Sequence, residues 1–307
     1  MRAAHITSYG GTEVLQVGEL PDPVVGPDSV LVRVRAAGIN PVDHKIRAGY
    51  LDGAFPSAFP LVLGWDVAGV VEQVGPGVTE HAVGDEVIGY VRKDHVQHGT
   101  YAELVAGTPR HFAPKPSSAS FDEAAGLPLA GLTALQSLEA AGVGRGDAVL
   151  VHAAAGGVGT FAVQLAAARG ARVLGTASEG NHEYLRSLGA EPLVYGEGLA
   201  GRVRELAAGP VDVAIDLVGG EALDVSFDLV GDAARVVSVT DAATVLERGG
   251  RYVFVRPDAA QLGALSRLVD DGTLRVEVSA RFGLDDVAQA HALLEQGHVR
   301  GKVVLTL

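Results

Sequence analysis

Cysteine is absent from this chain of 307 residues. Without a thiol, the chain cannot form disulfide bonds, bind zinc through thiolates, ligate an iron–sulfur cluster or use a cysteine nucleophile. Positive charge is scarce too, because 24 Lys and Arg stand against 37 Asp and Glu, which leaves a formal net charge of −13. Proteins that neutralise the phosphates of a nucleic acid or of an anionic membrane carry the opposite balance, so we expect neither partner.

The chain also lacks long apolar runs. No apolar span reaches the ~20 residues that cross a bilayer, and Met1–His5 leads into strand-like alternation without the apolar core of a signal peptide. Apolar residues make up 48% of the chain and charged residues 20%, as in ordinary folded proteins. Because one domain typically holds ~100–200 residues, we expect two domains. The lack of a signal core and of a membrane span favours a cytoplasmic enzyme.

Two textures divide the chain. Residues 1–118 contain short β-branched runs between Gly and Pro turns, which is typical of a β-barrel or sandwich. From residue 119 to residue 255, alanine-rich helical stretches alternate with short apolar runs, which predicts an α/β domain with a doubly wound parallel sheet. The expected strands are 148–152, 171–176, 192–195, 211–216, 234–239 and 251–255, and the expected helices include 158–169, 181–188, 198–207 and 221–230.

The last segment, residues 256–307, returns to the texture of the first third. Its pattern predicts helices at 258–271 and 285–296 and strands at 274–278 and 301–305. We therefore expect this segment to rejoin the first domain, which makes the parallel-sheet domain an insertion.

A glycine-rich turn follows the strand expected at 148–152. The segment Ala154–Gly159 reads Ala-Ala-Gly-Gly-Val-Gly and leads into a helix. In a dinucleotide-binding turn, a glycine such as Gly156 lets backbone amides approach a pyrophosphate at the helix N-terminus, and one such as Gly159 lets the helix pack tightly on the strand. We therefore predict that a dinucleotide contacts Ala155, Gly156, Gly157, Val158 and Gly159.

The end of the second strand indicates which dinucleotide is bound. An NAD-binding fold usually places an acidic residue there, ~20 residues after the turn, to bind the ribose 2′-hydroxyl. Here the strand ends in Thr176-Ala177-Ser178, and a hydroxyl donor favours a 2′-phosphate. We therefore predict NADP(H), with NAD(H) as the alternative if Glu179 takes the acidic position. The further residues expected to contact the cofactor are Thr176, Ser178, Asn181, His182, Tyr195 and Lys302.

Four motifs stand in order along the chain. They are GINPVD at 38–43, PLVLGWDVAG at 60–69, GLTAL at 131–135 and AAAGGVG at 153–159. Together they resemble the quinone oxidoreductase family of the medium-chain dehydrogenases/reductases, over essentially the whole chain. The resemblance implies a Rossmann sheet inserted into a GroES-like β-barrel catalytic domain, with a cleft between the two domains. Zinc-dependent relatives carry a cysteine ligand and Gly-His-Glu where this chain has Asn40 and Gly64-Trp65-Asp66, so the resemblance implies no catalytic metal.

The resemblance also implies which residues meet the nicotinamide. In these relatives an asparagine and a threonine lie beside its ribose, and the backbone after a later strand lies along its ring. The corresponding residues here, with one further expected contact at 218, are Asn40, Thr133, Val218, Val237, Ser238 and Val239. Family members are commonly dimers through the edge strand of the Rossmann sheet, which implies a homodimer through residues 251–255.

The chemistry implied is hydride transfer from NADPH to an electron-poor acceptor. A quinone needs little more, because solvent can protonate its reduced oxygens, whereas an enone benefits from a proton donor. The catalytic candidates are Asn40 and, as the donor, Tyr50; the alternative for Tyr50 is a ring that packs on the barrel with its hydroxyl in water. We expect a quinone reductase. The alternatives are an enoyl or 2-alkenal reductase and an NADPH-binding crystallin-like or regulatory protein without turnover.

One histidine-containing segment could suggest a metal. Asp94, His95 and His98 lie close together, but in a charged stretch without cysteine, which favours a solvated loop over a metal site.

Overall fold

The computed structural model describes every residue from 1 to 307. The chain forms two compact units, which we call unit 1 (Met1–Leu132, Arg256–Gly272 and Val276–Leu307) and unit 2 (Thr133–Val255 with Thr273–Arg275). We expected the second domain to start at residue 119, whereas residues up to 132 group with unit 1. The reason is packing, because α2 (Phe121–Ala125) contacts β3 (Val30–Ile39) and β5 (Asp66–Val74) of unit 1.

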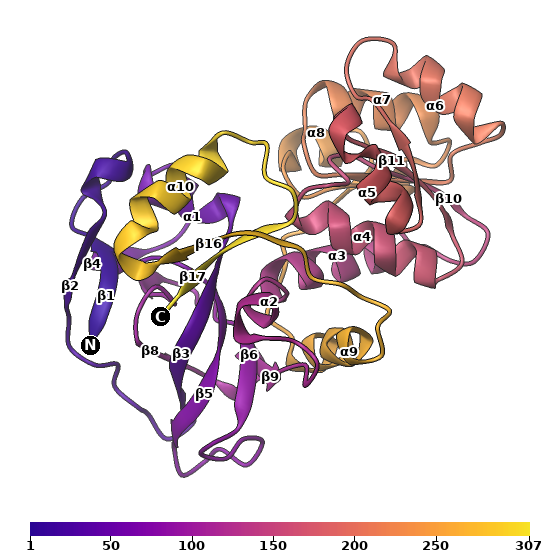
Figure 1. The fold of residues 1–307 in the computed structure, drawn as a ribbon. Helices are drawn as coiled ribbons and strands as arrows, with labels where there is room; N and C mark the ends of the chain where they lie inside the picture. The colour runs from indigo at the N-terminus through magenta and orange to yellow at the C-terminus, as the bar shows by residue number, and fades with distance from the viewer. The chain divides into compact units, whose positions relative to one another are not determined.

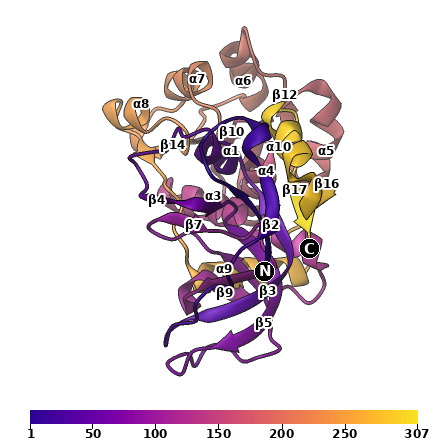
Figure 2. The ribbon, with the colours of Figure 1, turned by 90° about the vertical axis from the view of Figure 1, so that its left-hand side faces the viewer.

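Unit 1 is built on two β-sheets. The larger sheet has the order β16 (Val278–Gly283), β17 (Lys302–Thr306), β3, β5, β6 (Glu86–Tyr90) and β9 (Phe112–Pro114), with β8 (Leu104–Gly107) paired to β3. Figure 1 shows β16, β17, β3 and β5 side by side. The smaller sheet has the order β2 (Gln16–Glu19), β1 (Arg2–Ile6), β4 (Ser57–Val62) and β7 (Val96–His98), and Figure 2 shows β4 beside β7.

Strand β3 lies in the interior of the larger sheet. Its residues Val32, Val34 and Ala36 are buried, while Arg33 and Arg35 between them are exposed. This alternation follows from the pleat, which points successive side chains to opposite faces of a sheet. Because β3 pairs with β5 and β17, its carboxyl end lies inside the unit and brings the next residues of the chain into the core.

Short helices cover these sheets. Helix α10 (Val287–Glu295) packs on β16 and β17, as Figure 1 shows, and α9 (Ala259–Asp270) packs on β9. Helix α1 (Pro41–Arg47) contacts α10 through a buried arginine. The guanidinium of Arg47 hydrogen-bonds Nδ1 of His291 at 3.1 Å and pairs with the carboxylate of Glu295. These contacts fix the C-terminal helix on the first one.

The strand predicted at 274–278 is wrong. Residues 274–277 have no regular structure, and β16 begins only at Val278. The backbone of Arg275 bonds to a side chain instead of a strand: its N–H donates to Oε1 of Gln164 at 2.8 Å, and its carbonyl accepts Nε2 of Gln164 at 3.1 Å. Because Gln164 satisfies both backbone groups of Arg275, this residue needs no strand partner.

Unit 2 contains a six-stranded parallel sheet. Its order is β12 (Ala190–Leu193), β11 (Arg172–Thr176), β10 (Ala148–Val151), β13 (Val213–Asp216), β14 (Val236–Ser238) and β15 (Arg251–Tyr252). The predicted doubly wound sheet is therefore confirmed. The direction of winding reverses between β10 and β13, and ligands of such sheets bind at that reversal, outside the carboxyl ends of the strands.

Helices connect these strands. Helix α3 begins in unit 1 and precedes β10, and the others follow one strand each. Their bounds are α3 (Pro128–Ala140), α4 (Gly157–Ala168), α5 (His182–Ser187), α6 (Leu199–Ala207), α7 (Glu221–Leu229) and α8 (Ala242–Glu247).

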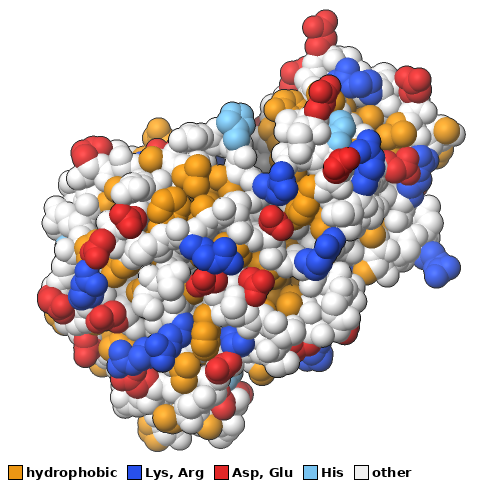
Figure 3. All heavy atoms as spheres, in the orientation of Figure 1, with side chains coloured by type: hydrophobic (Ala, Val, Ile, Leu, Met, Phe, Trp, Pro, Cys, Tyr) orange, Lys and Arg blue, Asp and Glu red, His pale blue; other side chains and the backbone are white.

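The surface carries mixed charge. On the face that Figure 3 shows, acidic and basic side chains are interspersed and no broad area has a single sign. Among the helices, none combines the length with the apolar character that crossing a bilayer would require.

A buried histidine in unit 1 is held in its neutral form. Nδ1 of His111 accepts the N–H of Thr108 at 2.9 Å, so the ring proton sits on Nε2, which donates to the carbonyl of Arg92 at 3.1 Å. Protonating Nδ1 would set two donors against each other. Burial, helped by the neighbouring charge of Arg110, lowers the pKa of His111 to about 4 from 6.5.

We expect His111 to make the protein acid-sensitive. Between pH 6.5 and pH 4 the unfolded chain binds this proton and the folded chain does not, so stability falls as the pH falls through this range. The contribution is about 3 kcal/mol in full. In His111→Asn, where an amide oxygen can still accept the Thr108 amide, urea unfolding should show a shallower dependence on pH. The exposed His298→Asn serves as the control. Equal slopes in wild type and His111→Asn would contradict this assignment.

Candidate dinucleotide-binding edge and buried polar cluster

The carboxyl edge of the sheet in unit 2 gathers most of the predicted cofactor residues. Strands β10, β11, β13 and β14 run parallel and in register, so the segments that follow them share one edge. The predicted residues at or just beyond this edge are Ala155, Gly156, Gly157, Val158, Gly159, Thr176, Ser178, Val218, Val237, Ser238 and Val239. The fold therefore brings these residues to one edge of the sheet, and their contact with a cofactor remains a prediction.

The glycine turn between β10 and α4 is tight. Ala153 adopts a left-handed conformation with φ of 49°, and Gly156 caps the helix with extended backbone. A Cβ on Gly159 would lie 2.3 Å from the carbonyl oxygen of Ala153 and 2.6 Å from Cα of Ala154, which no side chain can occupy. A Cβ on Gly156 would lie 3.3 Å from the same oxygen, so the space there is less restricted. Gly159 is thus the glycine that lets the helix close on the turn.

The N-terminus of α4 offers backbone donors without partners inside the helix. The first amides of any helix have no intrahelical acceptor. No side chain caps α4, and no acidic side chain stands in its first turn. The amides of Gly157, Val158 and Gly159, together with the positive end of the helix dipole, form an anion-binding position.

Threonine 176 acts on the turn itself. Its side chain is buried, and its hydroxyl accepts the N–H of Ala153 at 3.1 Å, while its carbonyl accepts the N–H of Ala154 at 2.9 Å. Ser178 is exposed instead, and its hydroxyl accepts Nδ2 of Asn181 at 3.2 Å. Of the two hydroxyls predicted to meet the cofactor, Ser178 is the accessible one, and Thr176 fastens the turn to β11.

Two further predicted residues lie beyond β11 and β12. His182 opens α5, and its Nε2 is buried without a hydrogen-bond partner. Tyr195 comes two residues after β12, which pairs with β11, and its side chain is 55% exposed. Both residues therefore follow the carboxyl ends of strands at the same edge of the sheet as Ser178.

An aspartate that the sequence reasoning missed organises the other half of this edge. Asp216 ends β13 and is fully buried. Its carboxylate accepts the amides of Val218 and Gly219 at 3.0 and 2.9 Å and the hydroxyl of Ser238 at 2.7 Å. The predicted residues Val218 and Ser238 are thus both held by Asp216. A lone acid that ends an apolar strand before Gly219-Gly220 was the available signal.

Asn40 lies in unit 1, in a buried polar cluster. It caps α1, and its Nδ2 donates to Oδ2 of Asp66 at 2.9 Å while its Oδ1 accepts the ammonium of Lys302. Lys302 also donates to the carbonyl of Ile39 at 3.2 Å and lies 3.5 Å from Asp66, whose other oxygen accepts the N–H of Leu129 at 2.8 Å. We predicted Lys302 near the cofactor phosphate. Its ammonium is instead occupied inside unit 1.

Burial governs the charges of this cluster. It raises the pKa of Asp66 and lowers the pKa of Lys302, and each shift is partly offset by the opposite charge of the partner. Burial also raises the pKa of Asp43 to about 7. Hydrogen bonds from the backbone N–H of Asn40 and from the hydroxyl of Tyr101, both at 2.8 Å, partly oppose this rise. The cluster therefore carries one carboxyl group, that of Asp43, that can hold a proton near neutral pH.

Tyr50 and Thr133, the remaining predicted residues, differ in exposure. Tyr50 follows α1 and is 78% exposed, and Thr133 is buried in α3. Trp65 packs its ring on Phe55 and Tyr90, with centroids 6.0 and 6.2 Å away. No group of three or more His, Cys, Asp and Glu side chains is arranged to hold a metal ion. The roles predicted for Tyr50 and Thr133 remain predictions.

We expect that removing one partner of the Lys302–Asp66 pair destabilises the fold much more than removing both charges does. Lys302→Met leaves the buried Asp66 without its cation and should lower the free energy of unfolding by about 3 kcal/mol. Because burial raises the pKa of Asp66, protonation relieves this penalty, and the loss should be smaller at low pH. Urea unfolding measures both effects.

Two further variants complete this test. Lys302→Met combined with Asp66→Asn removes both charges and should recover most of the lost stability. Lys45→Met, on the exposed face of α1, is the matched control and should change little. A double variant that is less stable than Lys302→Met alone would contradict the pairing.

Both units contain segments that match known protein families. Residues 26–117 match the family model of the alcohol dehydrogenase GroES-like domain, and residues 188–305 match that of a zinc-binding dehydrogenase. A 2-methylene-furan-3-one reductase from Solanum lycopersicum is 36% identical over 99% of this chain and 79% of its own length. An NADPH-dependent alkenal/one oxidoreductase of Arabidopsis thaliana chloroplasts is 35% identical over the same shares.

A solved structure agrees with these relatives. The quinone oxidoreductase from Coxiella burnetii superposes with a TM-score of 0.89 and 38% identity, over 100% of this chain and 99% of that one. The chain therefore belongs to the quinone oxidoreductase family of the medium-chain dehydrogenase/reductase superfamily, and it is an oxidoreductase.

Proposed function

We propose that this chain uses NADPH to reduce a quinone-type acceptor without a metal. The observation that carries the proposal is the uncapped N-terminus of α4, which lies at the winding reversal of the parallel sheet. The helix can pack this tightly against the glycine turn only because residue 159 is glycine. Such a position binds the pyrophosphate of a dinucleotide. When bound, NADPH would supply the hydride.

The residues at the carboxyl edge fit a dinucleotide. The amides of Gly157, Val158 and Gly159 have no acceptor within the helix and would hold the pyrophosphate. Thr176 and Asp216 fix the backbone on either side of this position through buried hydrogen bonds, so little ordering is required on binding. The chain's contribution is therefore a preorganised cradle.

A preference for the 2′-phosphate rests on the end of β11. Thr176 and Ala177 are buried there, which leaves the hydroxyl of Ser178 and the amide of Asn181 as the accessible polar groups. Both can donate to a phosphate oxygen. Glu179 is exposed in the next turn and is the residue that would favour NADH. The name of the NADPH-dependent Arabidopsis relative supports the phosphate.

The residues present do not fit the catalytic zinc that the matched family name suggests. Where the zinc-dependent relatives place a cysteine and a histidine, this chain has Asn40 and Trp65. The amide of Asn40 is bonded to Asp66 and Lys302, and the ring of Trp65 is packed among aromatic rings. Neither side chain is one of the usual ligands of zinc, and an ammonium already provides the positive charge of the cluster.

An enone or 2-alkenal is the second candidate acceptor. Two relatives are named for a methylene-furanone and for alkenals and alkenones, and the related solved structure is named for a quinone. All of these acceptors have an electron-poor double bond conjugated to a carbonyl group, to which hydride adds. They differ in the need for a proton donor, which we assign to the exposed hydroxyl of Tyr50.

We expect Tyr50→Phe to separate the two acceptors. Oxidation of NADPH and of NADH is followed side by side with a benzoquinone and with a 2-alkenal. If Tyr50 donates the proton, the variant should lose about 100-fold in kcat with the alkenal and keep its quinone rate within about twofold. The control is Tyr9→Phe, which removes a hydroxyl that donates to Asp52 at 3.1 Å. Equal losses with both acceptors would remove Tyr50 from proton transfer, and no oxidation with any acceptor would overturn the proposed function.

We expect Ser178→Asp to reverse the cofactor preference. A carboxylate at this position repels a 2′-phosphate and accepts from a 2′-hydroxyl, so the KM for NADPH should rise about tenfold or more while the KM for NADH stays level or falls. Ser178→Ala removes the hydroxyl without adding charge and should have a smaller effect. A wild type that prefers NADH, with no change in Ser178→Asp, would instead assign the ribose contact to Glu179.

A further inference from the structure

One arginine of unit 2 holds the loop that contains Tyr195. Arg202 lies in α6, and its guanidinium donates to four consecutive backbone carbonyls between β12 and α6. Two of its nitrogens bond the carbonyl of Val194 at 3.2 and 3.0 Å. The other carbonyls are those of Tyr195 at 3.4 Å, Gly196 at 3.2 Å and Glu197 at 2.8 Å. We call these four residues the β12–α6 loop, and a single side chain fixes the whole of it.

The backbone of the β12–α6 loop is shaped to meet the guanidinium. Gly196 and Gly198 have φ of 91° and 75°, in the left-handed region that favours glycine. A Cβ on Gly198 would lie 3.2 Å from a terminal nitrogen of Arg202. Because the loop wraps around this side chain, the planar fork of the arginine can bond several carbonyls at once, which a lysine ammonium cannot do in the same way.

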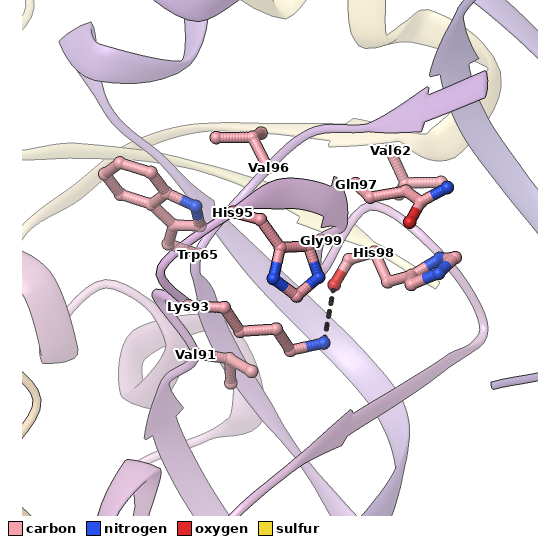
Figure 4. Close-up of a pocket in the computed structure, with 9 residues that line it drawn as sticks. All are labelled: Val62, Trp65, Val91, Lys93, His95, Val96, Gln97, His98 and Gly99. Atoms are coloured by element: carbon pink, nitrogen blue, oxygen red, sulfur yellow. Dashed lines mark hydrogen bonds between the residues drawn. The ribbon is translucent and has the colours of Figure 1, made fainter. Parts of the chain in front are cut away.

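A lysine of unit 1 shows how far this differs from an ordinary contact. Like Arg202, Lys93 forms no ion pair, and its Nζ donates to the carbonyl of His98 at 3.2 Å, as Figure 4 shows. That contact fixes one carbonyl, and the adjoining pocket has room for about one water molecule. Arg202 instead orders a complete loop.

The β12–α6 loop follows the strand next to the one that ends at Ser178. Strands β11 and β12 are parallel, Thr176 pairs with Leu193, and the N–H of Ala177 donates to the carbonyl of Leu193 at 2.9 Å. Ser178 comes directly after this contact on one strand, Tyr195 comes two residues after it on the other, and both side chains are exposed. Because neighbouring strands lie about 4.8 Å apart, one phosphate group can bridge the two hydroxyls.

We propose that Arg202 is a positioning residue for the 2′-phosphate of NADPH and that it acts through Tyr195. By holding the backbone of the β12–α6 loop, it keeps the hydroxyl of Tyr195 at the edge of the sheet, where this hydroxyl donates to a phosphate oxygen. Without Arg202, the loop has to be ordered when the cofactor binds, and the cost of ordering lowers the affinity. This role rests on the proposed use of NADPH.

Direct binding of NADPH and NADH tests the role on the full chain, without an acceptor. The two cofactors differ only in the 2′-phosphate, and the fluorescence of the reduced nicotinamide gives a Kd for each. The ratio of the two Kd values is compared within each variant, because partial unfolding weakens both apparent affinities equally. Wild type should bind NADPH more tightly, and Arg202→Gln should lose about tenfold of this ratio. The control is Arg204→Gln, which removes the same charge from an exposed position of α6 and should change the ratio less than twofold.

Two further variants separate position from charge. Arg202→Lys keeps the charge but lacks the planar fork, so it should lose as much of the ratio as Arg202→Gln. Tyr195→Phe removes the hydroxyl and should also lose about tenfold. Adding Arg202→Gln to Tyr195→Phe should cause little further loss, because both changes remove the same contact with the phosphate.

The outcomes distinguish this role from the proposed function. A wild-type ratio in Arg202→Gln or in Arg202→Lys would overturn the role of Arg202 and leave the use of NADPH standing. Fully additive losses in the double variant would do the same. Equal affinity of the wild type for NADPH and NADH would contradict the proposed cofactor, and the role of Arg202 would fail with it.

Discussion

The buried pair between Lys302 and Asp66 is the interaction on which unit 1 depends. It joins segments that lie far apart in the sequence: the first residue of β17, the first residue of β5, the end of β3 through Asn40, and the start of α3 through the amide of Leu129. An unpaired charge in such surroundings would cost several kcal/mol. The C-terminal strand must therefore return to the first domain, and a shift of its register would leave both charges without partners.

Unit 2 solves the corresponding problem with neutral hydrogen bonds and one carboxylate. Thr176 satisfies the amides of the glycine turn, and Asp216 satisfies those of the next loop while it holds Ser238. The amides at the start of α4 have no such partner. The open helix end, where the positive end of the helix dipole also lies, is therefore suited to an anionic ligand.

The two units contribute different information about function. The edge of unit 2 offers the uncapped helix end on which the proposed dinucleotide site rests, but it is silent on what receives the hydride. Unit 1 carries the exposed Tyr50, which we propose as the proton donor that distinguishes the two kinds of acceptor. The names of the relatives refer to a quinone, to a methylene-furanone and to alkenals or alkenones. Each of these is a conjugated carbonyl compound to which hydride can add.

The amino-acid sequence by itself determined the parallel sheet, the glycine turn and the positions of most helices. Those features depend on periodicity and on turn residues within a few positions of each other, so a local pattern suffices. The six-stranded sheet follows the expected alternation, and Gly159 has the close contact that the motif requires. Whether the residues of this edge touch a cofactor is a question that neither the pattern nor the fold answers.

Only the tertiary structure decided how the buried polar groups are paired. The strand predicted at 274–278 does not form because Gln164, 111 residues away, bonds the backbone of Arg275. Lys302 is occupied by Asn40, 262 residues away. Asp216 was not recognised because its partners are two amides of the next loop and the hydroxyl of Ser238, 22 residues away on another strand. Burial makes each polar group require a partner, but the partner is chosen by the packing of distant segments, and this choice leaves no periodic trace in the sequence.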